Sequence, residues 1–110
     1  MDAYDREREI EALKEQIIAG IKTIYDPEIP VNVYDLGLIY EINVQDDDSV
    51  DVVMTLTAPG CPVAGILPQQ VENRVRLTPG VTDARVELTF DPPYHRDMMS
   101  DEAKFELGFL

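Results

Sequence analysis

The sequence predicts an α+β domain with two layers, in which a small mixed three-stranded sheet carries helices over one face. An amphipathic helical pattern near the amino terminus precedes two alternating stretches that a short polar turn joins. A further helical stretch separates the second strand-like segment from a third, which favours a right-handed crossover and a parallel pair. The expected order is α-β-β-α-β-α, in a single domain over residues 1–110.

The first element is an amphipathic helix from about Asp5 to Ile24. Its apolar residues recur at three- and four-residue spacing between charged residues: Ile10, Leu13, Ile17, Ile21 and Ile24. Two prolines in residues 25–30 end this helix, because each removes a backbone donor and restricts the chain. The segment Asp35-Leu36-Gly37 then indicates a turn.

Two strands follow and form an antiparallel hairpin. The first alternates apolar and polar residues from Leu38 to Val44, and residues 46–49 are a polar turn. The second strand places its apolar residues on one face: Val50, Val52, Met54 and Leu56. Thr55 and Thr57 are expected to share the opposite face.

The second helix is expected from about Pro62 to Leu77, because Val63, Leu67, Val71 and Val75 lie four apart. Pro68 lies inside this range and predicts a kink or a restart of the helix. A third strand follows over residues 81–90, and residues 91–97 form a loop. Ser100 is placed to cap a last helix that runs to Leu110.

Composition limits the class of partner and the compartment. A net charge of −13 opposes nucleic-acid binding and docking on anionic membranes, although solubility alone accounts for most acidic surfaces. The apolar runs are too short to cross a membrane, and the acidic amino terminus does not resemble a secretory signal. A single cysteine cannot form an intramolecular disulfide, so a cytoplasmic location is expected.

That cysteine, Cys61, follows Gly60 and precedes Pro62 at a strand-to-helix junction. A thiol at a helix amino terminus has a lowered pKa, and Pro62 suits a first helical position. The alternative is a small buried residue that happens to be cysteine. Position alone does not decide between a functional and a packing role.

Other candidates each have an ordinary alternative. Asp26 and Glu28 flank Pro27 and could form a metal or acid–base pair, yet solvated acids after a helix are the more common case. Asp35 is likewise a standard turn residue. Thr55 and Thr57 could line the approach to Cys61 or simply occupy a solvated strand face. His95 is the only histidine, and its neighbours supply no ligand set.

Several segments together resemble the SufT-like iron–sulfur assembly family, which includes PaaD-type proteins and the cytosolic factors of the MIP-eighteen type. They are residues 25–30 (YDPEIP), 35–40 (DLGLIY), 54–62 (MTLTAPGCP), 79–81, 90–93, 98–100 and 106–110. The resemblance covers nearly the whole chain after about Ile17. Tyr94 stands where the family often has Trp.

The resemblance implies an iron–sulfur cluster assembly type of domain and a role in maturing iron–sulfur proteins in a SUF-type pathway. It also implies that one surface site gathers Asp26, Glu28, Asp35, Thr55, Thr57 and Cys61. Its partners would be the assembly machinery and apo iron–sulfur proteins, and no enzymatic activity is expected.

The chemistry of Cys61 limits what such a site can hold. A cluster generally needs four thiolates or equivalent ligands, so one cysteine per chain cannot hold it alone. No tightly bound cofactor is expected, and a labile cluster on Cys61 would be shared in a homodimer or completed by a partner. The alternatives are a non-catalytic adaptor that docks apo-targets without iron, and a thiol enzyme or redox sensor.

Overall fold

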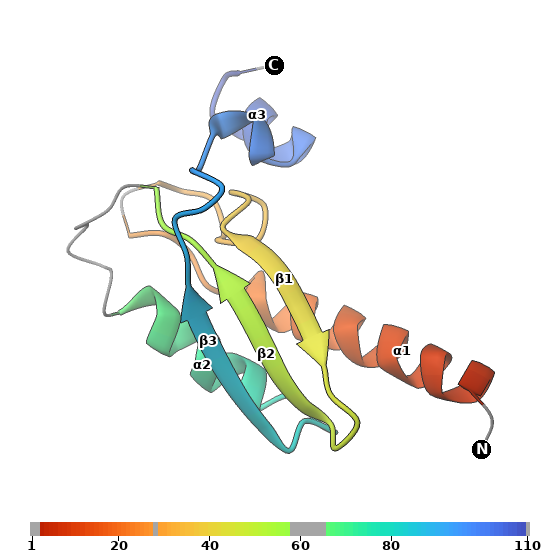
Figure 1. Ribbon diagram of the computed structural model, residues 1–110. Helices are drawn as coiled ribbons and strands as arrows, with labels where there is room; N and C mark the ends of the chain where they lie inside the picture. The colour runs from red at the N-terminus through yellow and green to blue at the C-terminus, as the bar shows by residue number, and fades with distance from the viewer. Residues whose placement is uncertain (1–2, 28, 58–65, 110) are drawn as a thin grey trace.

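The computed structural model describes residues 3–27, 29–57 and 66–109 (Figure 1). The elements are α1 (Ala3–Ile21), β1 (Ile39–Val44), β2 (Ser49–Met54), α2 (Leu67–Arg76), β3 (Asp83–Leu88), a 3-10 turn (Arg96–Met98) and α3 (Asp101–Glu106). This order confirms the predicted α-β-β-α-β-α arrangement. None of the helices in the described ranges combines the length and apolar character that crossing a bilayer requires.

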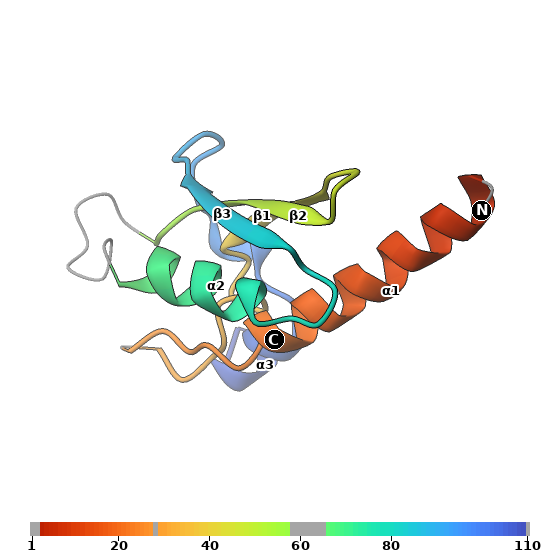
Figure 2. The ribbon, with the colours of Figure 1, turned by 90° about the horizontal axis from the view of Figure 1, so that it is seen from below.

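The sheet has three strands in the order β1-β2-β3, with β2 in the centre. β1 pairs with β2 antiparallel, and β2 pairs with β3 parallel, so the sheet is mixed as predicted. Figure 2 shows α1 and α2 against one face of the sheet, which leaves the other face without a helix. α3 lies beyond one end of the sheet (Figure 1).

The core forms between the covered face of the sheet and the two long helices. Val50, Val52 and Met54 of β2 are at most 1% exposed, so the predicted alternation of this strand is confirmed. They belong to one apolar cluster with Ile17 and Ile21 of α1 and with Val71 and Val75 of α2. Burial of these apolar side chains from both layers is the main force that holds the helices to the sheet.

Some element boundaries differ from the predicted ones. α1 ends at Ile21, three residues before Ile24. The structure describes α2 from Leu67, with Pro68 in its first turn, where a missing N–H costs no hydrogen bond. Residues 62–65 lie outside the described residues. α3 begins as predicted, with the Ser100 hydroxyl accepting from the Ala103 N–H at 3.1 Å, but it ends at Glu106.

The outer edge of β3 is covered by side chains of α2. The carboxylate of Glu72 accepts a hydrogen bond from the Val86 N–H at 3.1 Å, and Arg76 donates to the Ala84 carbonyl at 2.9 Å. Arg76 and Glu72 also form an ion pair at 3.5 Å. Two edge groups of β3 are therefore satisfied within the chain, which opposes pairing with another strand.

The turn before β1 is joined to the segment that leads into α3. Gly37 has φ +85°, and a Cβ at this position would overlap the backbone carbonyl of Met98. The Tyr94 hydroxyl donates to the Leu36 carbonyl at 2.5 Å, and the Ser100 N–H donates to the Asp35 carbonyl at 2.8 Å. The predicted turn at residues 35–37 is confirmed, and each of its three residues contacts the segment 94–100.

Gly37→Ala is expected to lower the free energy of unfolding by about 3 kcal/mol, because a left-handed φ and a steric overlap add together. Gly108→Ala is the matched control, since Gly108 also has a positive φ (+81°) but a Cβ added there would meet no atom within 4 Å. It should cost only about 1 kcal/mol. Urea unfolding of both variants measures the difference, and equal losses would contradict a close contact at Gly37.

Candidate functional site

Four of the six predicted site residues lie within the described ranges: Asp26, Asp35, Thr55 and Thr57. Glu28 and Cys61 lie outside the described residues. The described four come from two segments, the loop between α1 and β1 and the chain that leaves β2. Their surroundings differ strongly from one another.

Asp26 belongs to a loop that folds back on itself directly after α1. Tyr25 and Asn32 form an isolated antiparallel bridge, and the Asp26 N–H donates to the Val31 carbonyl at 3.4 Å. The carboxylate of Asp26 accepts from the Ile29 N–H at 3.2 Å, which is the local turn that Asp favours before an extended segment. Asp26 is half-buried, and its carboxylate has a defined position.

Asp35 is fixed by Asn32, a residue that the sequence reasoning missed. The Asn32 amide donates to the Asp35 carboxylate at 2.7 Å, and the Asp35 N–H donates back to the Asn32 side-chain oxygen at 2.8 Å. Asn and Asp three residues apart are a recognisable signal for such a turn. Asp35 lines a hollow of about 280 Å³ together with Glu102 and Glu106 of α3, and Asp26 is not among its lining residues.

The two threonines do not share a solvated face, so that expectation is wrong. β2 ends at Met54, and from there three consecutive residues are buried: Met54, Thr55 and Leu56. Thr55 is 0% exposed, and its N–H donates to the Leu38 carbonyl at 2.8 Å. Thr57 is exposed. The alternation fails here because the chain leaves the regular strand and passes close to the segment before β1.

Tyr94 links this region to the carboxy-terminal segment. Burial raises the pKa of Tyr94 to about 12, with further contributions from the hydroxyl of Tyr40 and the carboxylate of Asp26. The raised pKa keeps the hydroxyl protonated into alkaline solution, so it can keep donating its hydrogen bond to the Leu36 carbonyl. Asp26, Tyr94 and the turn at residues 35–37 form one connected region.

His95 has a local structural role. Its Nδ1 accepts from the Asp97 N–H at 3.1 Å at the start of the 3-10 turn, and it lies 3.3 Å from the Asp97 carboxylate. Within residues 3–27, 29–57 and 66–109, no group of three or more His, Cys, Asp and Glu side chains could hold a metal ion.

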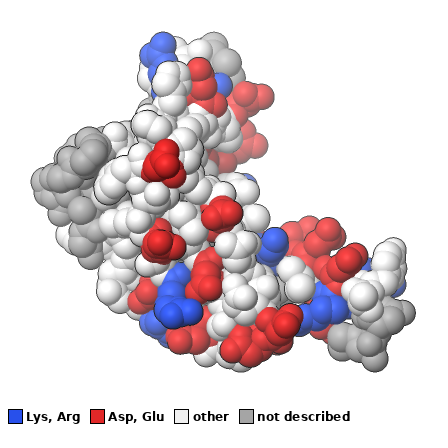
Figure 3. All heavy atoms as spheres, viewed as in Figure 1, with Lys and Arg blue, Asp and Glu red and all other residues white. Residues whose placement is uncertain are grey.

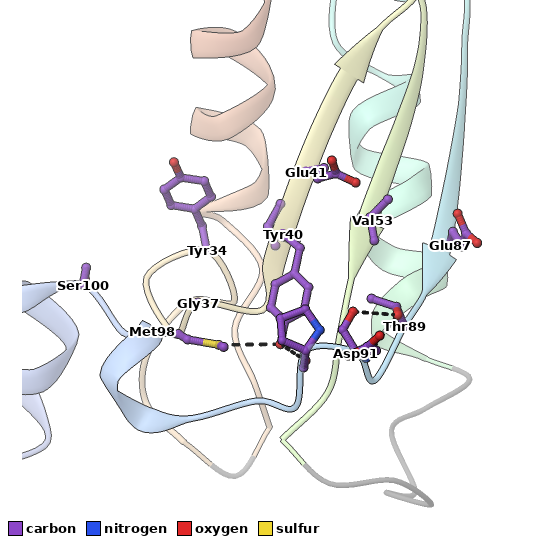
Figure 4. A pocket seen from close by; sticks show the side chains of 12 residues that line it. Tyr34, Gly37, Tyr40, Glu41, Val53, Glu87, Thr89, Asp91, Met98 and Ser100 are labelled. Carbon is purple, nitrogen blue, oxygen red and sulfur yellow. Dashed lines mark hydrogen bonds between the residues drawn. The ribbon is translucent and has the colours of Figure 1, made fainter.

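A cleft of about 790 Å³, which the sequence does not predict, lies on the side of the sheet that no helix covers (Figure 4). Tyr40, Pro92 and Met98 form one wall, where the Tyr40 hydroxyl donates to the Pro92 carbonyl at 2.8 Å. Glu41 and Glu87 lie on either side of Val53. No local sequence signal marks this cleft, because its walls come from three strands and a distant loop.

Comparison with known proteins gives a match that covers most of the chain. The sequence matches the family described as "Iron-sulfur cluster assembly protein" over residues 14–103. A "Fe-S protein maturation auxiliary factor" from Porphyromonas gingivalis is 53% identical over 97 residues, covering 88% of this chain and 92% of that protein. The "Fe-S protein maturation auxiliary factor SufT" from Staphylococcus aureus is 39% identical, covering 77% of this chain and 97% of that protein.

A solved structure shares the fold. The crystal structure of a domain of unknown function from Bacillus anthracis superposes with a TM-score of 0.83 at 31% identity, covering 91% of this chain and 95% of that one. The predicted fold class and the resemblance seen in the sequence are both confirmed.

Tyr94→Phe is expected to lower the free energy of unfolding by about 1 kcal/mol, because the Leu36 carbonyl loses its donor. The folded pKa of about 12 lies above the ordinary value of 10.0, so this tyrosine's pH-dependent stabilisation is complete below about pH 10 and disappears towards pH 12. Tyr4→Phe is the control, since Tyr4 is 64% exposed. An ultraviolet titration in which Tyr94→Phe loses no late-titrating tyrosine would contradict the assignment.

Proposed function

Because the chain belongs to the iron–sulfur cluster assembly protein family, we propose that it is an auxiliary factor in the maturation of iron–sulfur proteins. The observation that carries this proposal is the family match over residues 14–103, which includes every predicted site residue. The match covers 92% and 97% of the two relatives named above, so the comparison concerns nearly the whole of each. The pathway is of the SUF type, and the compartment is the cytoplasm.

Cys61 is the residue through which the protein would contact iron, a cluster or a partner thiol. It follows Thr57 by four residues, which span at most about 14 Å of extended chain. A thiolate supplies the soft ligand that iron–sulfur clusters use, and one cysteine supplies only one of about four ligands. The cluster is therefore cargo that passes through, shared between two subunits or completed by a partner, and not a resident cofactor.

The carboxylates have a supporting part in this proposal. Asp26 is held by the Ile29 N–H, and Glu28 is two residues away in sequence. Fixed negative charge near the thiolate would favour cationic iron. Asp35 faces α3 and stabilises the loop through its hydrogen bond with Asn32. Thr55 is buried and stabilises the same region from the core, whereas the exposed Thr57 can contact the cargo. The protein transfers cargo and performs no catalytic turnover of its own.

An adaptor role is the second candidate, and the open cleft favours it. An adaptor needs a surface that recognises other proteins, and the cleft offers aromatic and acidic groups on a face that no helix covers. In this alternative the protein brings apo-targets to the assembly machinery without binding iron, and Cys61 is not needed for docking.

Anaerobic reconstitution with iron and sulfide separates the two roles. Wild type is expected to retain iron and acid-labile sulfide, and Cys61→Ser is expected to lose most of both, because a serine hydroxyl is a poor ligand for this cargo. His95→Gln is the control and should retain them, since His95 is engaged with Asp97. Light scattering reports whether loaded protein is a dimer. Retention by neither wild type nor variant would reject the carrier role and leave the adaptor.

Asp26→Asn tests the carboxylate separately from the loop, because an amide oxygen can still accept from the Ile29 N–H. The variant should unfold like wild type yet lose reconstituted cargo about tenfold faster, as removal of supporting charges near metal sites does. Asp97→Asn removes the same charge from an exposed position, where the side chain is 77% accessible. Equal lifetimes of cargo in all three proteins would show that Asp26 has no electrostatic part.

A further inference from the structure

The open face of the sheet carries two neighbouring cross-strand rows. In one row Asn43, Asp51 and Arg85 lie side by side on β1, β2 and β3, and in the next row Glu41, Val53 and Glu87 do so. Figure 3 shows Asp and Glu side chains spread over the strands on this face, with few Lys and Arg among them. The two rows differ in how their charges are compensated.

Arg85 compensates the first row. Its guanidinium lies 3.4 Å from the carboxylate of Asp51, so a cation already occupies that part of the sheet. No Lys or Arg of the described residues forms an ion pair with Glu41 or Glu87 in the second row. Because neighbouring strands lie about 4.8 Å apart, the Cα atoms of Glu41 and Glu87 are roughly 10 Å apart across Val53. A guanidinium or ammonium group above Val53 would lie within reach of both carboxylates.

The cleft of about 790 Å³ continues from this second row towards the loop after β3 (Figure 4). Its apolar surface comes from Ile39, Val53 and the wall of Tyr40, Pro92 and Met98, and Met98 is 37% exposed. Asp91 supplies a third carboxylate to its lining. An apolar surface beside carboxylates that lack a cation fits a side chain or segment that is apolar in one part and cationic in another.

We propose that this cleft docks a segment of a partner protein that presents an Arg or Lys side chain next to an apolar side chain. The cation would form ion pairs with Glu41 and Glu87, as Arg85 does with Asp51. The apolar neighbour would pack on Tyr40, Val53 and Met98. The net charge of −13 favours a basic segment at long range. This docking surface goes beyond the carrier role, since it uses neither Cys61 nor bound cargo, and it gives the adaptor role a defined binding site and a partner chemistry.

A peptide pair tests the proposal directly. The probe is the pentapeptide acetyl-GLRLG-amide, and its control replaces the arginine with citrulline, which keeps the shape and removes the charge. Titration of isotope-labelled apo-protein at millimolar peptide should shift the backbone amide signals of Tyr40, Glu41, Val53 and Glu87, and the citrulline peptide should shift them little. Absence of these shifts, or equal shifts with both peptides, would overturn the proposal.

Two double variants of equal net charge locate the binding surface. The double variant Glu41→Gln with Glu87→Gln should raise the dissociation constant of the arginine peptide about three- to tenfold, because two exposed ion pairs are lost. Glu7→Gln with Glu11→Gln removes two exposed charges from α1 and should leave it unchanged. Equal weakening in both would show a general charge effect and overturn the cleft. Cys61→Ser should bind the peptide like wild type, so failure of the carrier role and failure of this docking surface are separate outcomes.

Discussion

The contact between the turn at residues 35–37 and the segment 94–100 fixes the part of the chain that follows β3. The carbonyls of Asp35 and Leu36 accept from Ser100 and Tyr94, and Gly37 brings its backbone against Met98. Only glycine combines the positive φ with this close approach. α3 makes no extensive contact with the strands, so this turn, together with the burial of Ala103 in the core cluster, positions it relative to the rest of the fold.

Two surfaces depend on this contact. With α3 held in place, Glu102 and Glu106 face Asp35 across a small hollow. With the loop 91–98 held in place, Pro92 and Met98 form the wall of the cleft against Tyr40. Tyr94 takes part in the same contact, because its hydroxyl donates to the Leu36 carbonyl of the turn. The loop after β3 is therefore a structural element of both surfaces, although it contains little regular structure.

Local patterns in the sequence are sufficient to predict the order of the helices and strands and the residues of the core. The alternation of β2, the cap at Ser100 and the turn ending in Gly37 each follow from the residue types themselves. The prediction for Thr55 is wrong because alternation puts this residue on the open face of a strand that continues, whereas β2 ends at Met54. The role of Tyr94 and the cleft could not be foreseen, since both depend on contacts between residues about 50 positions apart, such as Tyr40 with Pro92. The family resemblance added what local patterns lacked, a reason to consider Asp26 and Cys61 together.

The order of residues along the chain indicates how docking in the cleft and transfer through Cys61 would cooperate. Val53 lines the cleft, and the chain continues from it through Thr57 to Cys61. Because four residues of extended chain span at most about 14 Å, Cys61 stays within that distance of Thr57. The cleft uses the open face of β2, whereas Val52 and Met54 face the core, so a docked segment would not disturb the buried residues. A target held in the cleft would be presented near the thiol at a high effective concentration, which speeds transfer of a weakly held cluster. Weak ligation by one cysteine would then be an advantage, because the proposed cargo must leave as readily as it arrives.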